Sequence, residues 1–515
     1  MKKFLVISEV SKKQNYIFKT NKLKENIGAS NIIEYVTENV PRYVGKKCNL
    51  TLGEVSVGGG NSIFLLQTEE EEAKKFIKEV TKEVLCKFAG VEFFMTYIGY
   101  DEEVDSIIKS IDLLYKKLND KKTQRSSVFK RNSYGIEERC VSTGLAANGK
   151  ENKTLLSRES LIKRKWSERE FLKNLKAEKV PYSIETLMSK YIKEGYSFTN
   201  EIEKLGIQKG ENSYIAIVSL DGNKMGQKIQ SMKNKALKQY ENLNTKDANK
   251  EYINKLNEFS LNIKKYYYES FEYMLDKLIR NYDKLNEQLN LQVDEEGNKI
   301  MPIRPIILAG DDVCFICNAQ IAMECVNAFI TNLNTYTVEE ETLNACAGIS
   351  MMKSSNPFDR GYEIAEVLCK NCKAKIVDTE DASLIDYHIC EGEIGTSLSE
   401  IRDRAHIDKS INLNIKPLYI NNEVYNSYKN FKEEYKNIQL ISAESKGKVR
   451  KLRDVFPRGK EETKIFMNKY QISSKFNGKF GNIQSDFGFS KIDNKDTCLY
   501  FDLIELQDMF ITLED

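Results

Sequence analysis

The feature that most constrains this chain of 515 residues is a repeated order of predicted elements. The first copy lies near the N-terminus, where strand, helix and hairpin patterns follow one another. They predict a strand over 3–10, a helix over 14–38 interrupted near Gly28, a hairpin over 53–67, a helix over 69–89 and a strand over 91–99. This is the order of a ferredoxin-like or palm domain.

The same order returns later in the chain. It predicts a strand over 213–220, a long helical region, a hairpin over 303–317, a helix over 320–334 and a strand over 342–351. The two hairpins align without a gap, VGGGNSIFLL from residue 57 against LAGDDVCFIC from residue 308. We infer an internal duplication of the palm. The second copy carries acids where the first carries glycine and asparagine.

The predicted fold class is therefore α+β, with two ferredoxin-like palm domains, a helical connector and a helical C-terminal domain. The expected domains are a glycine-rich first palm over 1–104, the connector over 105–210, an acid-bearing second palm over 211–394 and the C-terminal domain over 395–515. The chain has few prolines and no low-complexity linker, which favours one packed body.

Composition excludes several classes of function. The 78 Lys and Arg nearly balance the 76 Asp and Glu, which excludes a strongly basic nucleic-acid coat. Two histidines are too few for a multi-histidine metal phosphohydrolase. Scattered cysteines predict reduced thiols. The N-terminal apolar run is too short for a signal peptide, and no run reaches the length of a membrane span. A cytoplasmic protein without a membrane partner is expected.

Two adjacent carboxylates interrupt the apolar hairpin of the second palm. Asp311 and Asp312 would repel each other, and each would be costly to desolvate. A divalent cation would relieve both effects, and Gly310 would let the backbone approach a phosphate. The alternative is an exposed Gly-Asp-Asp turn.

A third carboxylate, Asp221, follows the strand 213–220. In a palm the first strand lies beside the hairpin, so we expect Asp221 next to Asp311 and Asp312. Three oxygens from neighbouring strands suit Mg²⁺ or Mn²⁺ and leave positions for a triphosphate. The alternative is a strand-end turn capped by Asp. A metal site here would support attack of a sugar hydroxyl on a nucleotide α-phosphorus.

A later helix carries three lysines, Lys370, Lys373 and Lys375. They would reach the phosphates of a nucleotide or form a solvated face. Cys369 and Cys372 would share one face of the same helix, either for packing or for a metal or redox role.

Several motifs resemble the large palm-domain subunit of type III CRISPR effector complexes, the cyclic oligoadenylate synthetase. The resemblance extends from residue 4 to about residue 395 and more weakly beyond. The motifs are QNYIF from Gln14, NKLK from Asn21, GAS from Gly28, GGGN from Gly58, CVSTGLA from Cys140, DGNKMG from Asp221, AGDD from Ala309 and SLIDYH from Ser383.

The resemblance implies two nucleotide-cyclase-type palms that face each other, each holding one ATP. Asp221, Asp311 and Asp312 would be the catalytic and metal-binding residues. The implied nucleotide contacts are Gly59, Gly60 and Asn61, which would hold the acceptor, together with Ser30, Lys24, Gly222, Asn223, Gly310 and Lys375. The implied product is a cyclic (oligo)adenylate second messenger of antiviral defence, made with release of pyrophosphate.

The chain departs from the family pattern at several positions. Ala309 stands where the family usually has the first Gly of Gly-Gly-Asp-Asp, which is tolerated if its φ is negative. Asn223 replaces a frequent second Asp, and Lys12 replaces a common glycine. Cys140 stands alone where four cysteines would hold zinc, so no zinc is expected there. No N-terminal histidine–aspartate nuclease domain is recognised, and DNA cleavage is not expected.

Two other functions stay open from the sequence. One is a weakly active or inactive palm-duplicated scaffold subunit of a CRISPR-type ribonucleoprotein. The other is a cyclase that uses GTP, or a sensor that binds nucleotide without turnover. The expected partners are therefore ATP or GTP, RNA or effector subunits, and a second copy of the chain.

Overall fold

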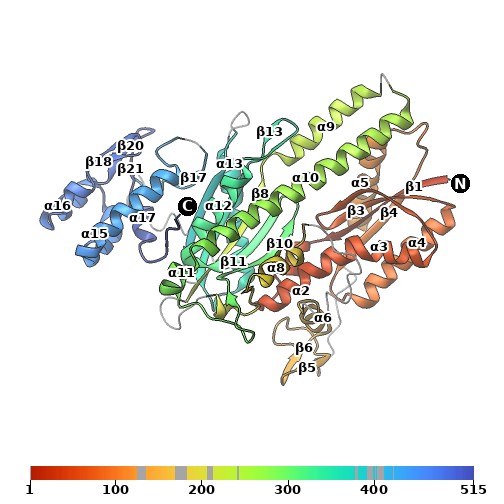
Figure 1. Cartoon of the computed structure of the whole chain (residues 1–515), viewed down its shortest axis with the longest axis horizontal. Coiled ribbons are helices and arrows are strands. Elements are labelled where there is room, and N and C mark those ends of the chain that lie inside the picture. Colours follow the sequence, from red (N-terminus) through yellow and green to blue (C-terminus); the bar gives the residue numbers. More distant parts are fainter. Residues whose placement is uncertain are drawn as a thin grey trace.

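A computed structural model describes most of the chain. The described residues are 2–124, 135–168, 182–205, 213–240, 243–376, 381–390, 398, 400, 402, 411–421 and 423–514. Figure 1 shows three parts along the long axis: an N-terminal sheet with its helices, a central sheet, and a C-terminal part at the opposite end.

The first sheet contains four antiparallel strands in the order β2-β3-β1-β4. The strands are β1 (Lys2–Ser11), β2 (Leu52–Gly58), β3 (Asn61–Thr68) and β4 (Glu92–Tyr100). The helices are α1 (Lys13–Ile17), α2 (Leu23–Glu34), a π-helical turn (Tyr35–Asn39), α3 (Val40–Lys47), α4 (Glu70–Lys87) and α5 (Ile107–Gln124). This arrangement confirms the predicted first palm.

The predicted interruption at Gly28 is wrong. Gly28 lies inside α2, and the break falls between α1 and α2 instead. The glycine serves packing, because a Cβ at this position would lie 1.7 Å from the carbonyl oxygen of Lys163. That oxygen belongs to α6 (Arg158–Trp166), which crosses α2 at this point. Sequence periodicity cannot distinguish a helix break from a site of close helix approach.

The central sheet has six strands in the order β10-β11-β8-β14-β15-β17. Its strands are β8 (Tyr214–Gly222), β10 (Ile303–Ala309), β11 (Asp312–Asn318), β14 (Ala345–Lys353), β15 (Leu384–Cys390) and β17 (Leu418–Tyr419). Its helices are α9 (Met225–Gln239), α10 (Thr245–Arg280), α11 (Tyr282–Leu289), α12 (Ala322–Leu333) and α13 (Phe358–Lys375). The α+β fold with two palm-type sheets is confirmed.

The apolar run of β8 follows from burial on both faces of this sheet. Ala216 and Val218 belong to one hydrophobic cluster, with Phe329 of α12. Ile215 and Ile217 belong to another cluster, which also receives side chains of α13. A strand covered on both sides needs no alternation of polar and apolar residues. Because β8 is held so firmly, the residue at its end has a fixed position.

The duplication is visible in the strand pairing. Gly58 pairs with Asn61 across the first hairpin turn, as Ala309 pairs with Asp312 across the second. The two hairpins also share one irregularity at the same distance from the turn. Their pairing shifts between Glu54 and Ser56 in the first and between Pro305 and Ile307 in the second.

The equivalence continues into the neighbouring strand and beyond it. Glu9 pairs with Asn61 as Asp221 pairs with Asp312. Three residues after each acid stands a lysine with left-handed φ, 53° at Lys12 and 58° at Lys224. This backbone conformation is uncommon for residues other than glycine. Lys12, which stands where the family commonly has glycine, therefore keeps a backbone conformation that favours glycine.

The remaining elements connect the two palms or follow the second one. Between the palms lie β5 (Gly149–Glu151), β6 (Thr154–Leu156), α6, α8 (Ile184–Lys193) and β7 (Tyr196–Ser197). The C-terminal part contains α15 (Tyr428–Val455), α16 (Lys460–Lys469) and α17 (Phe501–Glu505). It also has short strands that the pattern did not predict, β16 (Ile411–Asn412), β18 (Gly478–Phe480), β19 (Ile483–Ser485), β20 (Phe489–Ile492) and β21 (Lys495–Cys498).

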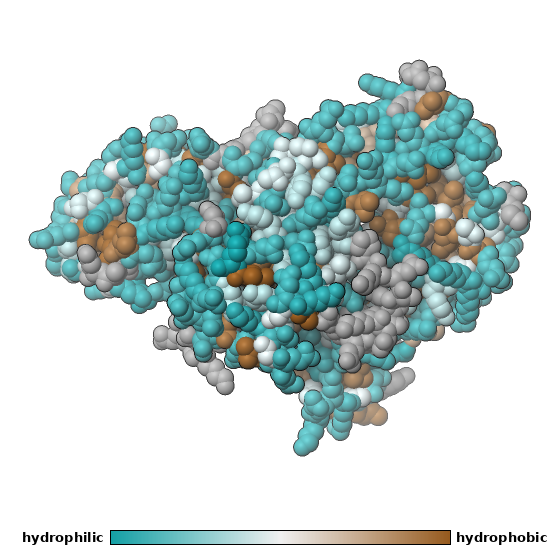
Figure 2. Space-filling model, viewed as in Figure 1, coloured by the Kyte–Doolittle hydropathy of each residue, from teal (hydrophilic) through white to brown (hydrophobic). Residues whose placement is uncertain are grey.

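The surface carries no continuous apolar band on the face shown in Figure 2, where hydrophobic residues are scattered among hydrophilic ones. Among the helices in the described residues, none combines the length and the apolarity needed to cross a membrane.

Candidate functional site

The three predicted acids lie together at one end of the central sheet. Asp221, at the end of β8, pairs directly with Asp312, the first residue of β11. Asp311 lies in the turn before it, and its carbonyl oxygen accepts a hydrogen bond from the amide of Gly222, 3.3 Å away. The expected adjacency of Asp221 to the Asp311–Asp312 pair is therefore confirmed.

The acids are in an electrostatically unfavourable environment. Burial raises the pKa of Asp311, and the charge of Asp221 raises it further. The same two causes, in the same order, raise the pKa of Asp312 to about 7. A carboxylate that is desolvated beside another carboxylate favours its neutral form unless a cation is supplied.

A lysine of α13 supplies one cation. Lys373 Nζ lies 2.7 Å from Oδ2 of Asp221 and 2.9 Å from the carbonyl oxygen of Gly222. The Asp221 side chain is 51% exposed, so this pair is accessible to water. Of the three lysines predicted on this helix, the middle one therefore reaches the acids.

The donor set fits a hard divalent cation by its chemistry. Three carboxylates on two neighbouring strands offer the oxygen ligands that Mg²⁺ and Mn²⁺ prefer. Within the described residues, no group of three or more His, Cys, Asp or Glu side chains is already arranged to hold a metal ion. Asp221 is paired with Lys373 instead. Metal binding would thus require this carboxylate to exchange its lysine partner.

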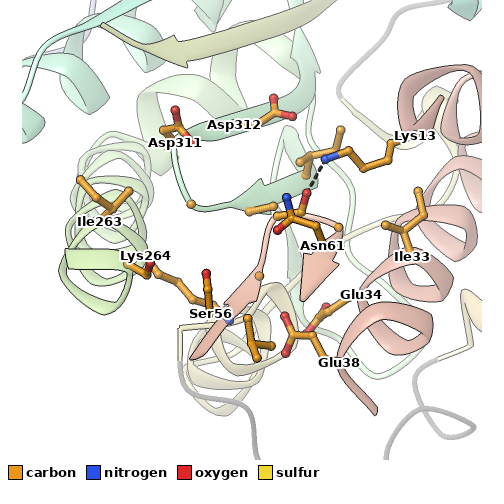
Figure 3. Close-up of a pocket in the computed structure, with 18 of the residues that line it drawn as sticks. Lys13, Ile33, Glu34, Glu38, Ser56, Asn61, Ile263, Lys264, Asp311 and Asp312 are labelled. Atoms are coloured by element: carbon orange, nitrogen blue, oxygen red, sulfur yellow. Dashed lines mark hydrogen bonds between the residues drawn. The ribbon is translucent and has the colours of Figure 1, made fainter. Parts of the chain in front are cut away.

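A cavity of about 560 Å³ separates the two palms beside the acids. Its wall includes both hairpin turns, the first with Gly59, Gly60 and Asn61 and the second with Gly310, Asp311 and Asp312. Figure 3 shows Asn61 of the first hairpin next to the second hairpin with Asp311 and Asp312, and Glu34 and Glu38 at the end away from the aspartates. Apolar side chains of α10, among them Ile263, complete the wall.

The cavity collects some of the predicted nucleotide contacts but not all of them. Ser30 lines it, as do the four hairpin residues Gly59, Gly60, Asn61 and Gly310, and the predicted catalytic residues Asp311 and Asp312 lie in the same wall. Gly222 and Asp221 lie next to this wall through their contacts with the Asp311–Asp312 turn.

Three predicted contacts lie elsewhere. Lys24 forms ion pairs with Glu151 and Glu168, at 3.5 and 3.7 Å. Asn223 is buried and donates through Nδ2 to the carbonyl oxygen of Ala382, 2.9 Å away. Lys375 lines a different cavity, beside the C-terminal part. The structure does not bring these three side chains to the space between the palms.

Five charged residues of the cavity wall were not predicted from the sequence: Lys13, Glu34, Glu38, Lys233 and Lys264. The equivalence of the two hairpins offered a signal for Lys13, because it places this residue just beyond the strand that corresponds to β8. The other four lie on helical segments, Glu34 at the end of α2, Glu38 in the π-helical turn, Lys233 on α9 and Lys264 on α10, and no local motif marks them.

The first palm contains a counterpart of the acid–lysine pair. Glu9 occupies the position of Asp221, and Lys122 Nζ lies 2.6 Å from its Oε1. Lys122 and Lys373 are both third from the end of an 18-residue helix, α5 and α13 respectively. The first palm therefore keeps the ion pair, while Asn61 takes the place of Asp312.

Two departures from the family pattern can be examined in the structure. The φ of Ala309 is not positive, so the backbone at this position accommodates a methyl group. This is the condition under which alanine is tolerated in place of glycine. Cys140 is buried, with its Sγ 3.6 Å from Ser160 Oγ. Polar neighbours from α6 therefore surround the single cysteine.

Fold and site together define a two-palm protein in which only the second palm carries paired aspartates. Residues 214–382 match the family model for the second palm domain of Cas10/Cmr2. This stretch is thus similar to a Cas10/Cmr2 second palm domain, and the resemblance to the large subunit of type III CRISPR effector complexes is confirmed. A search of curated proteins finds no significant match.

Several solved structures of low sequence identity are similar to this chain. The Csm1–Csm4 cassette in complex with pppApApA has 12% identity and a TM-score of 0.51, covering 98% of this chain and 69% of that one. The cassette with cA4 has 11% identity and a TM-score of 0.49, covering 99% and 70%. The cassette with cA3 has 13% identity and a TM-score of 0.45, covering 75% and 54%. The first match shows a common fold over nearly the whole chain.

Proposed function

We propose that this protein is a metal-dependent nucleotidyltransferase that joins and cyclises ATP into a cyclic (oligo)adenylate, with release of pyrophosphate. The single observation that carries the proposal is the register of Asp221 opposite Asp312, beside Asp311, at the edge of a cavity between two palms. The Csm1–Csm4 structures with similar folds contain pppApApA, cA4 and cA3, which supports adenine nucleotides as the substrate class.

The metal would be Mg²⁺ or Mn²⁺, held by Asp221, Asp311 and Asp312. It would supply charge neutralisation at the phosphates and a lower pKa of the attacking sugar hydroxyl. The residues of the chain do the rest. The second-palm hairpin orients the carboxylates from a rigid strand pair, and apolar side chains such as Ile263 line the cavity beside them.

The first palm is assigned to the acceptor nucleotide. Its hairpin turn presents Gly59, Gly60 and Asn61 to the same cavity as the aspartates. The amide of Asn61 is uncharged and binds a hydroxyl or another neutral group of the nucleotide. The carboxylate of Asp312, at the equivalent position of the second palm, would repel a negatively charged group. Two hairpins of the same geometry but different charge would therefore hold two nucleotides in different roles.

The test is incubation of the purified full chain with ATP and Mg²⁺ or Mn²⁺, followed by analysis of pyrophosphate and nucleotide products. We expect pyrophosphate and a new cyclic product, and no activity from the Asp311→Ala, Asp312→Ala double variant. Parallel reactions with GTP determine the base preference. Absence of pyrophosphate with both nucleotides, with and without added RNA, would refute the proposed reaction.

A scaffold role is the second candidate. The ion pair between Asp221 and Lys373 favours it, because it leaves the described acids without a ready metal cluster. The Csm1 proteins of similar fold were solved together with Csm4. Purification from the native host separates the two functions, since a scaffold would copurify with RNA and effector subunits and still release no pyrophosphate.

A further inference from the structure

Lys13 lies in the wall of the cavity without a carboxylate partner. It is the first residue of α1 and enters from the first palm, whereas Asp311 and Asp312 enter from the second (Figure 3). Its Nζ donates a hydrogen bond to the carbonyl oxygen of Gly59. It forms no ion pair with any residue that the structure describes.

The neighbouring lysine behaves differently. Lys12 is exposed and forms a surface ion pair with Glu92, with Nζ 3.3 Å from Oε1. Lys13 forms no such ion pair and donates to a neutral carbonyl oxygen, so its ammonium is available to an anionic ligand, whereas Lys12 already has a carboxylate partner.

The Lys13 side chain lies against a turn residue that lacks a Cβ. A Cβ on Gly60 would lie 2.4 Å from Lys13 Cδ and 3.1 Å from Lys13 Nζ. Met225 occupies the position of the second palm that corresponds to Lys13. It lies three residues after Gly222, and Lys13 lies three residues after the equivalent Val10. Only the first palm thus offers a cation at this point.

The other two lysines of the cavity wall, Lys233 and Lys264, have different surroundings from Lys13. Lys233 is already paired with Asp112, at 2.6 Å. Lys264 lies toward the end of the cavity that carries Glu34 and Glu38 (Figure 3). Lys13 is the lysine of the cavity wall that lies between the two hairpin turns. Its positive charge lowers the pKa of Asp312, whereas burial raises it. A phosphate group between the turns would therefore meet Lys13.

We propose that Lys13 is a cross-palm phosphate-binding residue, which contacts the polyphosphate of the nucleotide held by the second-palm acids. The side chain exchanges the Gly59 carbonyl for a phosphate oxygen when a triphosphate enters, since a charged acceptor binds an ammonium more strongly than a neutral one. The proposal rests on the proposed function, because it takes a nucleoside triphosphate as the ligand of the cavity. It makes Lys13 a positioning residue that couples the two palms.

The test measures binding, not turnover. Full-length wild type, Lys13→Met, Lys13→Arg and the matched control Lys12→Met are titrated with α,β-methylene ATP, inorganic tripolyphosphate and adenosine in the presence of Mg²⁺. We expect Lys13→Met to weaken both polyphosphate ligands by about tenfold or more and to leave adenosine binding unchanged. Lys13→Arg keeps the charge and should stay within about threefold of wild type. Lys12→Met should match wild type.

Equal affinities of wild type and Lys13→Met for tripolyphosphate would overturn the inference, and so would an equal loss of adenosine binding, which indicates a structural role. The two proposals fail separately. ATP turnover by the wild type with no effect of Lys13→Met on binding would refute only the role of Lys13. Lys13-dependent binding of tripolyphosphate without any pyrophosphate release from ATP would refute only the proposed reaction.

Discussion

Lys373 Nζ lies 2.7 Å from Oδ2 of Asp221, the acid that faces Asp312 across two neighbouring strands. An intramolecular cation thus occupies the place next to the acids where a divalent metal is expected. This relationship gives the first prediction.

Removing the Lys373 charge should tighten metal binding in the absence of nucleotide. Lys373→Met abolishes a competing cation and its repulsion of the metal, and we expect Mn²⁺ affinity to rise roughly three- to tenfold at this partly exposed site. Isothermal titration of the full chain with Mn²⁺ measures it. Lys370→Met is the matched control, because Lys370 pairs with Glu366 on the same helix. Weaker Mn²⁺ binding in Lys373→Met would contradict the idea of competition.

Replacing Asp312 by Asn should stabilise the metal-free protein at high pH. Burial, followed by the charge of Asp221, raises the pKa of Asp312 to about 7, far above the ordinary value for Asp. Between pH 4 and 7 the folded state therefore retains a proton that the unfolded state has lost, and stability falls as pH rises. At pH 8 we expect Asp312→Asn to gain roughly 1–3 kcal/mol in the free energy of unfolding.

The gain should shrink toward zero below about pH 3, where both states of the wild type hold the proton. Denaturant unfolding at a series of pH values in EDTA measures it. Added Mn²⁺ should reverse the order, by stabilising the wild type and not the variant. A variant less stable than wild type at pH 8 in EDTA would show that Asp312 is not strained by its surroundings.

The two equivalent acids of the palms should differ in their effect on catalysis. Asp221→Asn removes a proposed metal ligand, and we expect the rate of pyrophosphate release to fall roughly a hundredfold or more. Glu9→Gln alters the corresponding position in the first palm, where Asn61 replaces the second acid, and the rate should fall less than about tenfold. Initial-rate kinetics compares the pair directly. Equal losses would place metal chemistry in both palms.

Stability should depend on Gly28 because of the close approach of α6. In Gly28→Ala the new methyl group would lie 1.7 Å from the carbonyl oxygen of Lys163, so we expect a loss of more than about 2 kcal/mol. Gly447→Ala is the control, since a Cβ at this position of α15 meets nothing within 4 Å and should change stability by no more than about 1 kcal/mol. Thermal and denaturant unfolding of both variants decides the matter.

The sequence predicted the hairpins well because they depend on local patterns. The gap-free alignment of the two turns corresponds to the observed pairing of Gly58 with Asn61 and of Ala309 with Asp312. The adjacency of Asp221 to these acids followed from the strand order of a palm. Such features require only periodicity, turn chemistry and a topology with few alternatives.

Other features depend on how distant elements meet, and local patterns could not predict them. Gly28 was assigned to a helix break, although it permits contact with Lys163, far away in sequence. Lys24 was expected at a nucleotide, but it pairs with Glu151 of the connector. Lys373 and Lys375 differ by two positions on one helix, which is enough to direct one to Asp221 and the other to a different cavity.

The last strand of the central sheet comes from the C-terminal part of the chain. β17 pairs with β15 through Leu384–Tyr419 and Ile385–Leu418, so this edge of the sheet is closed by residues that are synthesised after both palms. A nascent or truncated chain that ends before residue 418 would leave the backbone groups at the buried start of β15, at Leu384 and Ile385, open to any other strand. Expression of the two palms alone is therefore expected to give self-association, and the C-terminal part protects the sheet that carries the acids.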